Sequence, residues 1–213
     1  MIGSPEINKV IRQILSPTLK ENGFDKVNTR HNWGWHNHCT WVFDITAVGK
    51  NFSDITGWSP MSVYVDLGIF YDFVPPKDGE IKIGTKNELI PKPHQCQLQK
   101  QLHCRVDQSI YTNKLDNPAE KKRNDIWWIE PNGSNIEEVI NDIKQSFLSD
   151  GLEWLLKNTD LETAFKEIES EHDSFNKFYK ARCFAEHLND NFKFEEYSEL
   201  LEKEQKRIDG LFS

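Results

Sequence analysis

The chain has no long apolar run and no recognisable sorting segment. No stretch approaches the roughly 20 apolar residues of a membrane-spanning helix. The first residues, MIGSPEINKV, turn polar at once, unlike the apolar centre of a signal peptide. We therefore expect a cytoplasmic protein. In that compartment the few cysteines, at positions 39, 96, 104 and 183, are expected to be reduced thiols rather than disulfides.

Positive charge is also scarce. The chain has 26 lysines and arginines against 34 aspartates and glutamates, and its formal net charge is −8. Phosphate backbones and anionic membrane surfaces require clustered basic residues, so we expect neither nucleic-acid nor membrane binding. The single basic cluster, EKKRN at 120–124, is typical of a solvated loop. The negative charge fits a basic protein partner, although solubility alone also explains it.

The motifs of several common active sites are absent. No CxxC, GxGxxG, GxxxxGK[ST] or GxSxG pattern occurs in the sequence. This argues against a redox dithiol, a nucleotide-binding loop and a serine nucleophile elbow. Histidine and cysteine are neighbours at 38–39 and 103–104. Because the side chains of adjacent residues diverge, we do not expect a histidine-activated thiol at either place.

The hydrophobic pattern changes period along the chain. Residues 5–22 have the period of a helix, in which Pro17 is expected to introduce a kink or a break and Gly23 a stop. TWVFDITAV (40–48) and MSVYVDLGIFYDF (61–73) alternate with period two and predict strands. The intervening NFSDITGWSP is predicted to be a turn. A link this short favours an antiparallel pair, since a parallel pair needs a longer crossover.

The second half of the chain is predicted to be mostly helical. IWWIE (126–130) is predicted to be a further strand, whereas 96–106 could be a strand or a short helix. Ser134 and Glu137 have the spacing of a capping box at a helix start, and Asp160 is a candidate cap for a later helix. Two final helices joined by the short turn NDNF predict an antiparallel hairpin.

This order of elements predicts an α+β fold, with an antiparallel sheet packed against N-terminal and C-terminal helices. We expect an α+β domain over residues 1–170 and a C-terminal helical hairpin over residues 171–213.

The stretch HNWGWHNHC (31–39) is a candidate metal site. His36 and His38 are two apart, so on a strand they would point to the same face. Zinc binds histidine nitrogen and cysteine sulfur, usually with four ligands, so His94 or Cys96 could complete a site if the fold brought them near. Because the spacing matches no familiar zinc pattern, we favour the plainer interpretation that these side chains lie near the entrance to a strand.

A second candidate site is the less apolar side of the predicted sheet. Asp44 and Asp66 interrupt two apolar strands and would share a face if the strands pair. Paired carboxylates hold hard metal ions or divide acid and base roles. The candidate polar–aromatic binding surface combines both aspartates with residues Tyr64, Phe70, Trp128 and an exposed Trp58. The alternation is equally explained by a solvent-facing sheet.

Several segments resemble a bacterial family known as domain of unknown function 4304. The resemblance is carried by PTLKENGFDK (17–26), VYVDLGIF (63–70), HQCQLQKQL (94–102), the WW pair at 127–128 and EEVINDIKQSFLSDGLEWL (137–155). It covers about residues 5–170 and leaves the predicted hairpin outside. The resemblance implies an α+β domain but no agreed activity and no catalytic residue.

Three functions are compatible with these features. The first is a non-catalytic protein-binding module, such as an immunity or defence-associated protein that masks a basic partner. The second is a metal-assisted hydrolase that uses the His36/His38 area, with zinc as a candidate cofactor, or the Asp44/Asp66 face. The third is a small-ligand binder that uses the aromatic side of the sheet.

Overall fold

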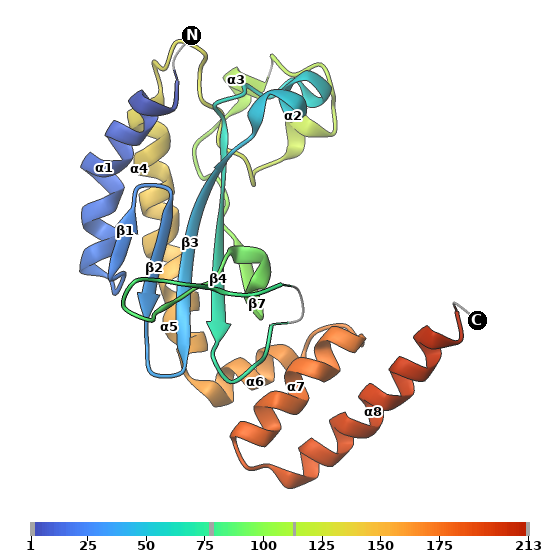
Figure 1. The fold of residues 1–213 in the computed structure, drawn as a ribbon. Helices are drawn as coiled ribbons and strands as arrows, with labels where there is room; N and C mark the ends of the chain where they lie inside the picture. The colour runs from blue at the N-terminus through green and yellow to red at the C-terminus, as the bar shows by residue number, and fades with distance from the viewer. Residues whose placement is uncertain (1–2, 77–78, 113, 212–213) are drawn as a thin grey trace.

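A five-stranded antiparallel sheet forms the centre of the molecule, in the order β1-β2-β3-β4-β7 (Figure 1). The structure, a computed structural model, describes residues 3–76, 79–112 and 114–211. Residues 77 and 78 of one loop, and 212 and 213 of the predicted hairpin, lie outside these ranges. The strands are β1 (Lys26–Asn28), β2 (His31–Trp35), β3 (Cys39–Ala47), β4 (Val63–Tyr71) and β7 (Leu98–Gln101).

The central pair β3–β4 confirms the two predicted strands and their antiparallel arrangement. Since side chains alternate along a strand, one face carries a continuous apolar set. This set is formed by Trp41, Phe43 and Ile45 of β3 and by Val65, Leu67 and Ile69 of β4, all of them buried.

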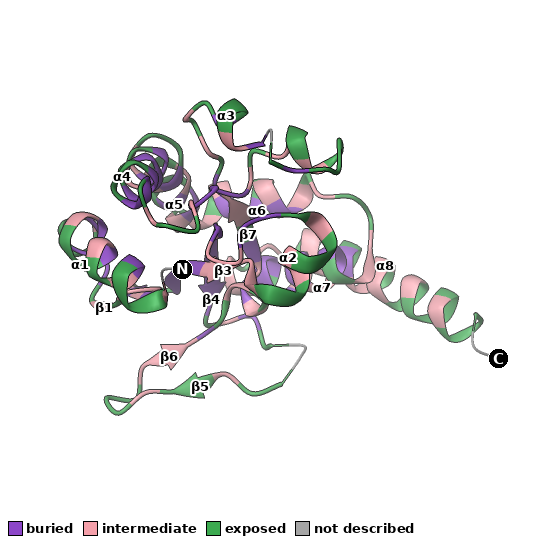
Figure 2. Ribbon diagram, turned by 90° about the horizontal axis from the view of Figure 1, so that it is seen from above, coloured by how far each residue is buried: buried purple, intermediate pink, exposed green. Residues whose placement is uncertain are grey.

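Helices from both ends of the chain cover this apolar face. They are α1 (Ser4–Glu21), α4 (Ile136–Ser146) and α5 (Leu152–Thr159). Figure 2, which looks from above, shows α1 and α4 on one side of the sheet and the small hairpin of β5 (Lys82–Ile83) and β6 (Leu89–Ile90) on the other. The predicted α+β architecture is therefore confirmed. The second face of the sheet is not covered by these helices but mainly by loops.

Helix α1 continues through Pro17, so of the two outcomes predicted there, a kink or a break, the break is wrong. Proline removes one backbone hydrogen bond, but Leu15 and Leu19 on either side are both fully buried against the sheet. This burial holds the last turn in place. Gly23 adopts a φ of +90° and ends the helix as predicted.

Three other local predictions need correction. Residues 51–56 of the predicted turn NFSDITGWSP (51–60) belong instead to helix α2 (Gly49–Thr56). IWWIE makes only one isolated bridge, Val63 to Trp127, instead of a strand. Helix α4 begins after Asn135, and no capping box forms, because the Ser134 N–H donates to Asn132. The ambiguous segment 96–106 contains a strand, β7.

Helices α4 and α5 form one continuous rod through a π-helical turn, Phe147–Gly151. Gly151 allows this rod to approach the sheet closely, since a Cβ there would lie 3.0 Å from Leu67 Cδ1. Asp160 then caps α6 (Leu161–Glu169) as predicted, by accepting a hydrogen bond from the Thr163 N–H.

The chain ends in the predicted helical hairpin, made of α7 (Phe175–His187) and α8 (Asn191–Asp209). Helix α7 packs on the sheet's end, whereas α8 projects away from the body (Figure 1). Phe184 lies in the main core against Tyr71 and Phe165. Shorter helical segments lie at Pro93–Gln95, Ser109–Thr112 (α3) and Glu120–Lys122.

All four cysteines are free thiols. None of the helices in the described ranges is long and apolar enough to cross a membrane.

Candidate binding groove on the open face of the sheet

The face of the sheet opposite the helices is covered at both ends and open between them. At one end Trp58, Leu115, Ile126 and Trp128 form a small buried cluster; at the other, Val42, Phe70 and Cys96 form another. Between them lies a groove of about 1030 Å³, which we call the acidic groove after the two aspartates, Asp44 and Asp66, on its floor. Its lining includes His31, Trp33, Val42, Asp44, Thr46, Tyr64, Asp66, Lys82, Ile90, Pro91, Lys92, His94, Gln99, Lys100 and Gln101.

A row of polar side chains crosses the floor of the acidic groove. In the strand register His31 of β2 is opposite Asp44 of β3, Asp44 is opposite Asp66 of β4, and Asp66 is opposite Gln101 of β7. Directly opposed residues in a sheet share a face and have neighbouring Cβ atoms. The structure therefore brings Asp44 and Asp66 together as predicted, and adds His31 and Gln101 to them.

Asp44 is buried and has two hydrogen-bond donors. Only 7% of the residue is exposed. Thr46 Oγ1 donates to Asp44 Oδ2 at 2.7 Å, and His31 Nδ1 donates to Asp44 Oδ1. The carboxylate thus fixes the orientation of the His31 imidazole, whose ring is largely exposed at the edge of the groove.

Asp66 differs from Asp44 because its carboxyl has no such support. Among the residues that the structure describes, none donates a hydrogen bond to it. Burial first, and the nearby negative charges of Asp44 and Asp125 second, raise the pKa of Asp66 to about 6. The same causes, burial and then Asp66, raise the pKa of Tyr64. The floor therefore offers a carboxyl suited to accept a proton or a cation.

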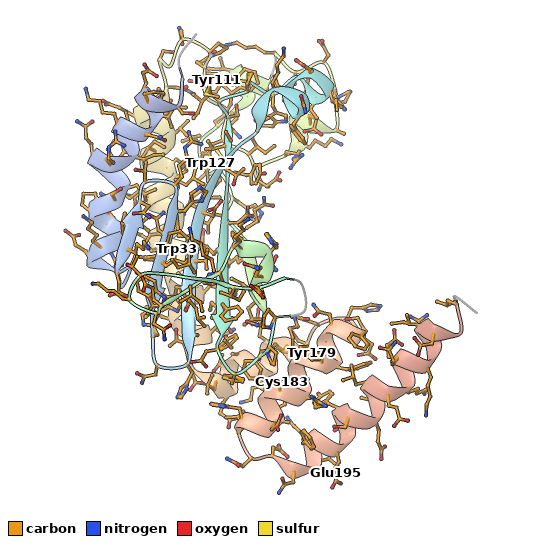
Figure 3. All side chains as sticks on the ribbon, viewed as in Figure 1. Trp33, Tyr111, Trp127, Tyr179, Cys183 and Glu195 are labelled. Carbon is orange, nitrogen blue, oxygen red and sulfur yellow. The ribbon has the colours of Figure 1, made fainter. Side chains whose placement is uncertain are left out.

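One wall of the groove is the loop that carries β5 and β6, held on the sheet by two tryptophans. Trp33 Nε1 donates to the Pro91 carbonyl and Trp35 Nε1 to the Leu89 carbonyl, each at 2.8 Å. Figure 3 shows Trp33 on the sheet beside this loop. The predictions from sequence missed this role, although two tryptophans at a spacing of two on one strand were a usable signal.

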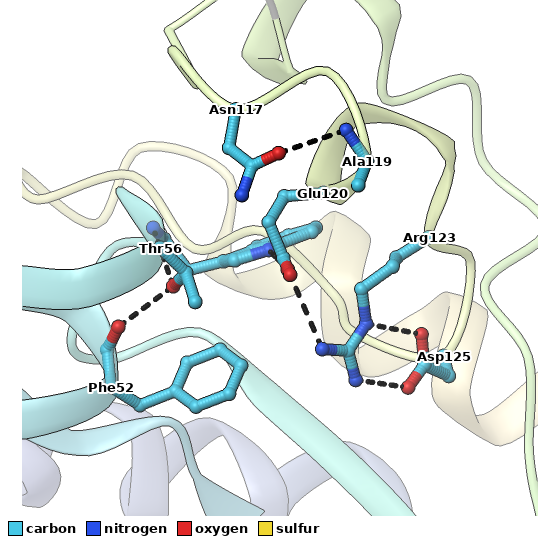
Figure 4. Close-up of polar contacts among 8 residues, drawn as sticks. Phe52, Thr56, Asn117, Ala119, Glu120, Arg123 and Asp125 are labelled. Carbon is cyan, nitrogen blue, oxygen red and sulfur yellow. Dashed lines mark hydrogen bonds and ion pairs between the residues drawn. The ribbon is translucent and has the colours of Figure 1, made fainter.

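Three aromatic residues of the predicted binding surface are buried. Trp58, predicted to be exposed, is 1% exposed, while Trp128 is 4% and Phe70 is 2% exposed. Trp58 Nε1 donates to Glu120, which also contacts Arg123 in the network shown in Figure 4. These side chains form the two covering clusters, so only Tyr64 of the predicted aromatics lines the acidic groove.

The four predicted metal ligands are not brought together. His36 packs on the Trp41 ring, 4.0 Å between centroids, on the helix-covered side, whereas Cys96 packs with Val42 on the opposite side. The His38 ring lies 5.1 Å from that of His187, and His94 lies at the groove. The chain turns directly after β2, so the period of a strand does not hold from 36 to 38.

Metal and thiol chemistry therefore find little support in the side-chain placement. In the described part of the chain, no three His, Cys, Asp or Glu side chains are grouped so that they could hold a metal ion. Burial raises the pKa of Cys39 and that of Cys104 to about 12, which disfavours the reactive thiolate at both positions.

The family model described as Domain of unknown function (DUF4304) matches residues 15–157. The chain belongs to this family. The DUF4304 match includes all four residues of the polar row and ends in α5, so α6, α7 and α8 follow it. The chain matches no curated protein and no solved structure.

Proposed function

We propose that this DUF4304 protein is a non-catalytic binding protein that holds a segment of a basic partner protein in its acidic groove. The observation that carries the proposal is Asp66, a half-buried carboxyl without a hydrogen-bond donor among the described residues, on the floor of an open groove. Concave surfaces with a few convergent polar groups are the usual place for recognition. A role in immunity or defence, in which the protein masks a basic toxin, fits this chemistry.

The overall charge supports the same partner. A net charge of −8 attracts a basic protein over distances near the Debye length and speeds the encounter. Surface charge alone gives little specificity, so the groove must supply the fixed contacts.

The proposal is tested with a variant whose groove is filled by a bulky side chain and which should no longer bind the partner. Gln101 lies on the floor at the edge strand β7, and Gln101→Trp places a bulky side chain there. Glu137→Trp, on the exposed surface of α4, is the matched control. Wild-type protein and E137W should retain the same stoichiometric partner from an extract of the source organism, and Q101W should not.

The retained partner must then bind again when both proteins are purified. We expect titration calorimetry to show binding to wild type and E137W and a loss of at least about tenfold in affinity for Q101W. Absence of a stoichiometric partner, or equal binding by Q101W, would contradict the proposal.

A hydrolase is the second candidate, favoured by the His31–Asp44 pair. An imidazole oriented by a carboxylate, beside a second carboxyl whose pKa is about 6, has the components of acid–base catalysis. Hydrolysis of p-nitrophenyl phosphate or p-nitrophenyl acetate, with and without Mg²⁺, Mn²⁺ or Zn²⁺, tests this candidate. Turnover that is lost in both His31→Asn and Asp66→Asn would replace the binding proposal.

A further inference from the structure

Two aspartates at directly opposed positions of a sheet repel each other unless a positive charge or a proton lies between them. In the acidic groove the two carboxyls are not equivalent. The oxygens of Asp44 are occupied by His31 and Thr46, whereas those of Asp66 have no donor within the described residues. Asp66 is therefore the carboxyl that lacks its counter-charge.

The chain's own cations do not supply this charge. Lys82, Lys92 and Lys100 line the groove, but in the described ranges no ion pair joins any of them to Asp66. Lys100 is opposite Leu67 in the register, so its side chain leaves the strand on the helix-covered side. The His31 imidazole is held by Asp44. A counter-charge other than a proton would therefore have to come from another molecule.

The surroundings of Asp66 favour a guanidinium over other cations. A guanidinium is planar, offers parallel N–H donors to a carboxylate and stacks on aromatic rings. The rings of Trp33 and Tyr64 line the groove on either side of the floor, and the Gln101 amide lies next to Asp66. A hard divalent ion would need more oxygen ligands than this floor groups together.

We propose, building on the proposed function, that the acidic groove receives an arginine side chain of the partner protein, with its guanidinium paired to the Asp66 carboxylate. The net charge of −8 and the open form of the groove favour a protruding basic segment as the source of this side chain.

The pairing makes binding dependent on pH. Protons and the guanidinium compete for the same carboxyl, so binding weakens as the pH falls through about 6. The ionisable groups that surround Asp66 on the groove, or act on its charge, are Asp44, His31, Tyr64, Glu80, Lys82, Lys92, His94 and Asp125.

The experiment uses the full chain and a short peptide with one central arginine between glycines, acetylated and amidated. The matched peptides replace arginine by citrulline, which has the same shape without the charge, or by lysine. Binding is followed by ¹H–¹⁵N chemical shifts at pH 7.5 and pH 5. We expect saturable shifts at β3, β4 and β7 amides with the arginine peptide, weaker ones with lysine and none with citrulline.

Asp66→Asn should reduce the affinity for the arginine peptide by about tenfold or more, a typical effect of losing a charge-assisted pair. Asp54→Asn, on the exposed surface of α2, removes the same charge elsewhere and should bind as wild type does. The inference is overturned if citrulline binds as well as arginine, if D66N binds unchanged, or if D54N loses as much affinity as D66N.

The experiments distinguish a failure of the proposed function from a failure of the arginine inference. If a partner depends on the groove in the Q101W test but the arginine peptide does not bind, the proposed function stands and the arginine inference is wrong. If the peptide binds at Asp66 but the partner is retained by Q101W, the peptide site is real and the proposed function is wrong. A thermal unfolding curve of D66N shows that any loss of binding occurs in folded protein.

Discussion

Asp44 and Asp66 are the same residue type on adjacent strands, yet their surroundings give them different chemistry. Asp44 is buried and accepts two side-chain hydrogen bonds, while Asp66 is half-buried and accepts none from the described residues. A buried carboxyl without donors favours its neutral form. Asp66 therefore costs stability whenever it is ionised, a cost that a cationic ligand would remove.

This cost predicts an effect of Asp66→Asn on stability. The pKa of Asp66 is about 6 in the folded chain and near its ordinary value of 3.8 when unfolded. The folded state therefore binds the proton more tightly, so stability falls as the pH rises from about 4 to 6 and stays reduced above that range. At pH 8 we expect D66N to be more stable than wild type by on the order of 1 kcal/mol, after allowance for solvent screening.

Urea unfolding at pH 4 and pH 8 measures the effect. The advantage of D66N should shrink at pH 4, where the folded-state carboxyl is protonated and the unfolded-state carboxyl is near its ordinary pKa of 3.8. Asp54→Asn, at an exposed site, should show no such pH-dependent gain. A D66N variant that is less stable than wild type at pH 8 would refute the explanation.

At the residue scale, the sequence could predict which side chains share a strand face but not which of them are covered. The period-two pattern and one antiparallel pair suffice to place Asp44 beside Asp66. Trp58, Trp128 and Phe70 are covered by segments without regular period. The contacts that position such segments, such as Trp33 to Pro91, span 58 positions of sequence. No local pattern encodes a contact of that separation.

At the element scale, long periodic segments were predictable and short ones were not. Helix α1 and strands β3 and β4 have enough apolar positions to define a period. Strand β1 has three residues and β2 has five, too few for a pattern to stand out. The link 49–56 contains turn-forming residues but folds as α2, which packs Phe52 beside the Trp58 cluster. Here packing outweighs local propensity.

Strand β2 also depends on a close backbone contact. Gly34 lies against Gly23, the residue that ends α1, and a Cβ on Gly34 would lie only 2.1 Å from the Gly23 carbonyl oxygen. Gly34→Ala must therefore push β2 away from the end of α1. We expect a loss of about 2 to 4 kcal/mol in the free energy of unfolding, measured by urea denaturation.

The matched control is Gly210→Ala near the end of α8. Its φ is −69°, and the nearest atom to an added Cβ is 3.4 Å away, so a methyl group fits. G210A should stay within about 0.5 kcal/mol of wild type. Equal stability of G34A and wild type would show that the glycine contact does not constrain β2.

At the scale of the whole molecule, the question is how the hairpin relates to the domain before it. The sequence predicted a division at residues 170 and 171, and the DUF4304 match ends at residue 157. In the structure, however, one hydrophobic core contains both sheet residues and α7 residues. Lys180 Nζ of α7 also donates to the Gln97 carbonyl, just before β7. These contacts predict that hairpin and sheet unfold together.

Phe184 provides the sharpest test of this coupling. Its ring is fully buried, and the ring centroid lies 4.8 Å from that of Tyr71 and 4.9 Å from that of Phe73. Phe192 of α8, in contrast, is 79% exposed. Phe184→Ala should cost about 3 to 5 kcal/mol by leaving a cavity, and Phe192→Ala almost nothing. All seven tryptophans lie between residues 33 and 154, so their fluorescence reports only on the part before the hairpin.

If the hairpin were an independent unit, F184A would leave the tryptophan-detected urea transition where it is in wild type. We instead expect F184A to unfold in one cooperative transition whose midpoint lies at a lower urea concentration than that of wild type. The midpoint of F192A should equal that of wild type. Helical circular dichroism should follow the same curve, since most of the helix that α7 and α8 contribute would melt with the sheet. Separate fluorescence and dichroism transitions would mean that the added helices are a second domain that only rests against the DUF4304 core.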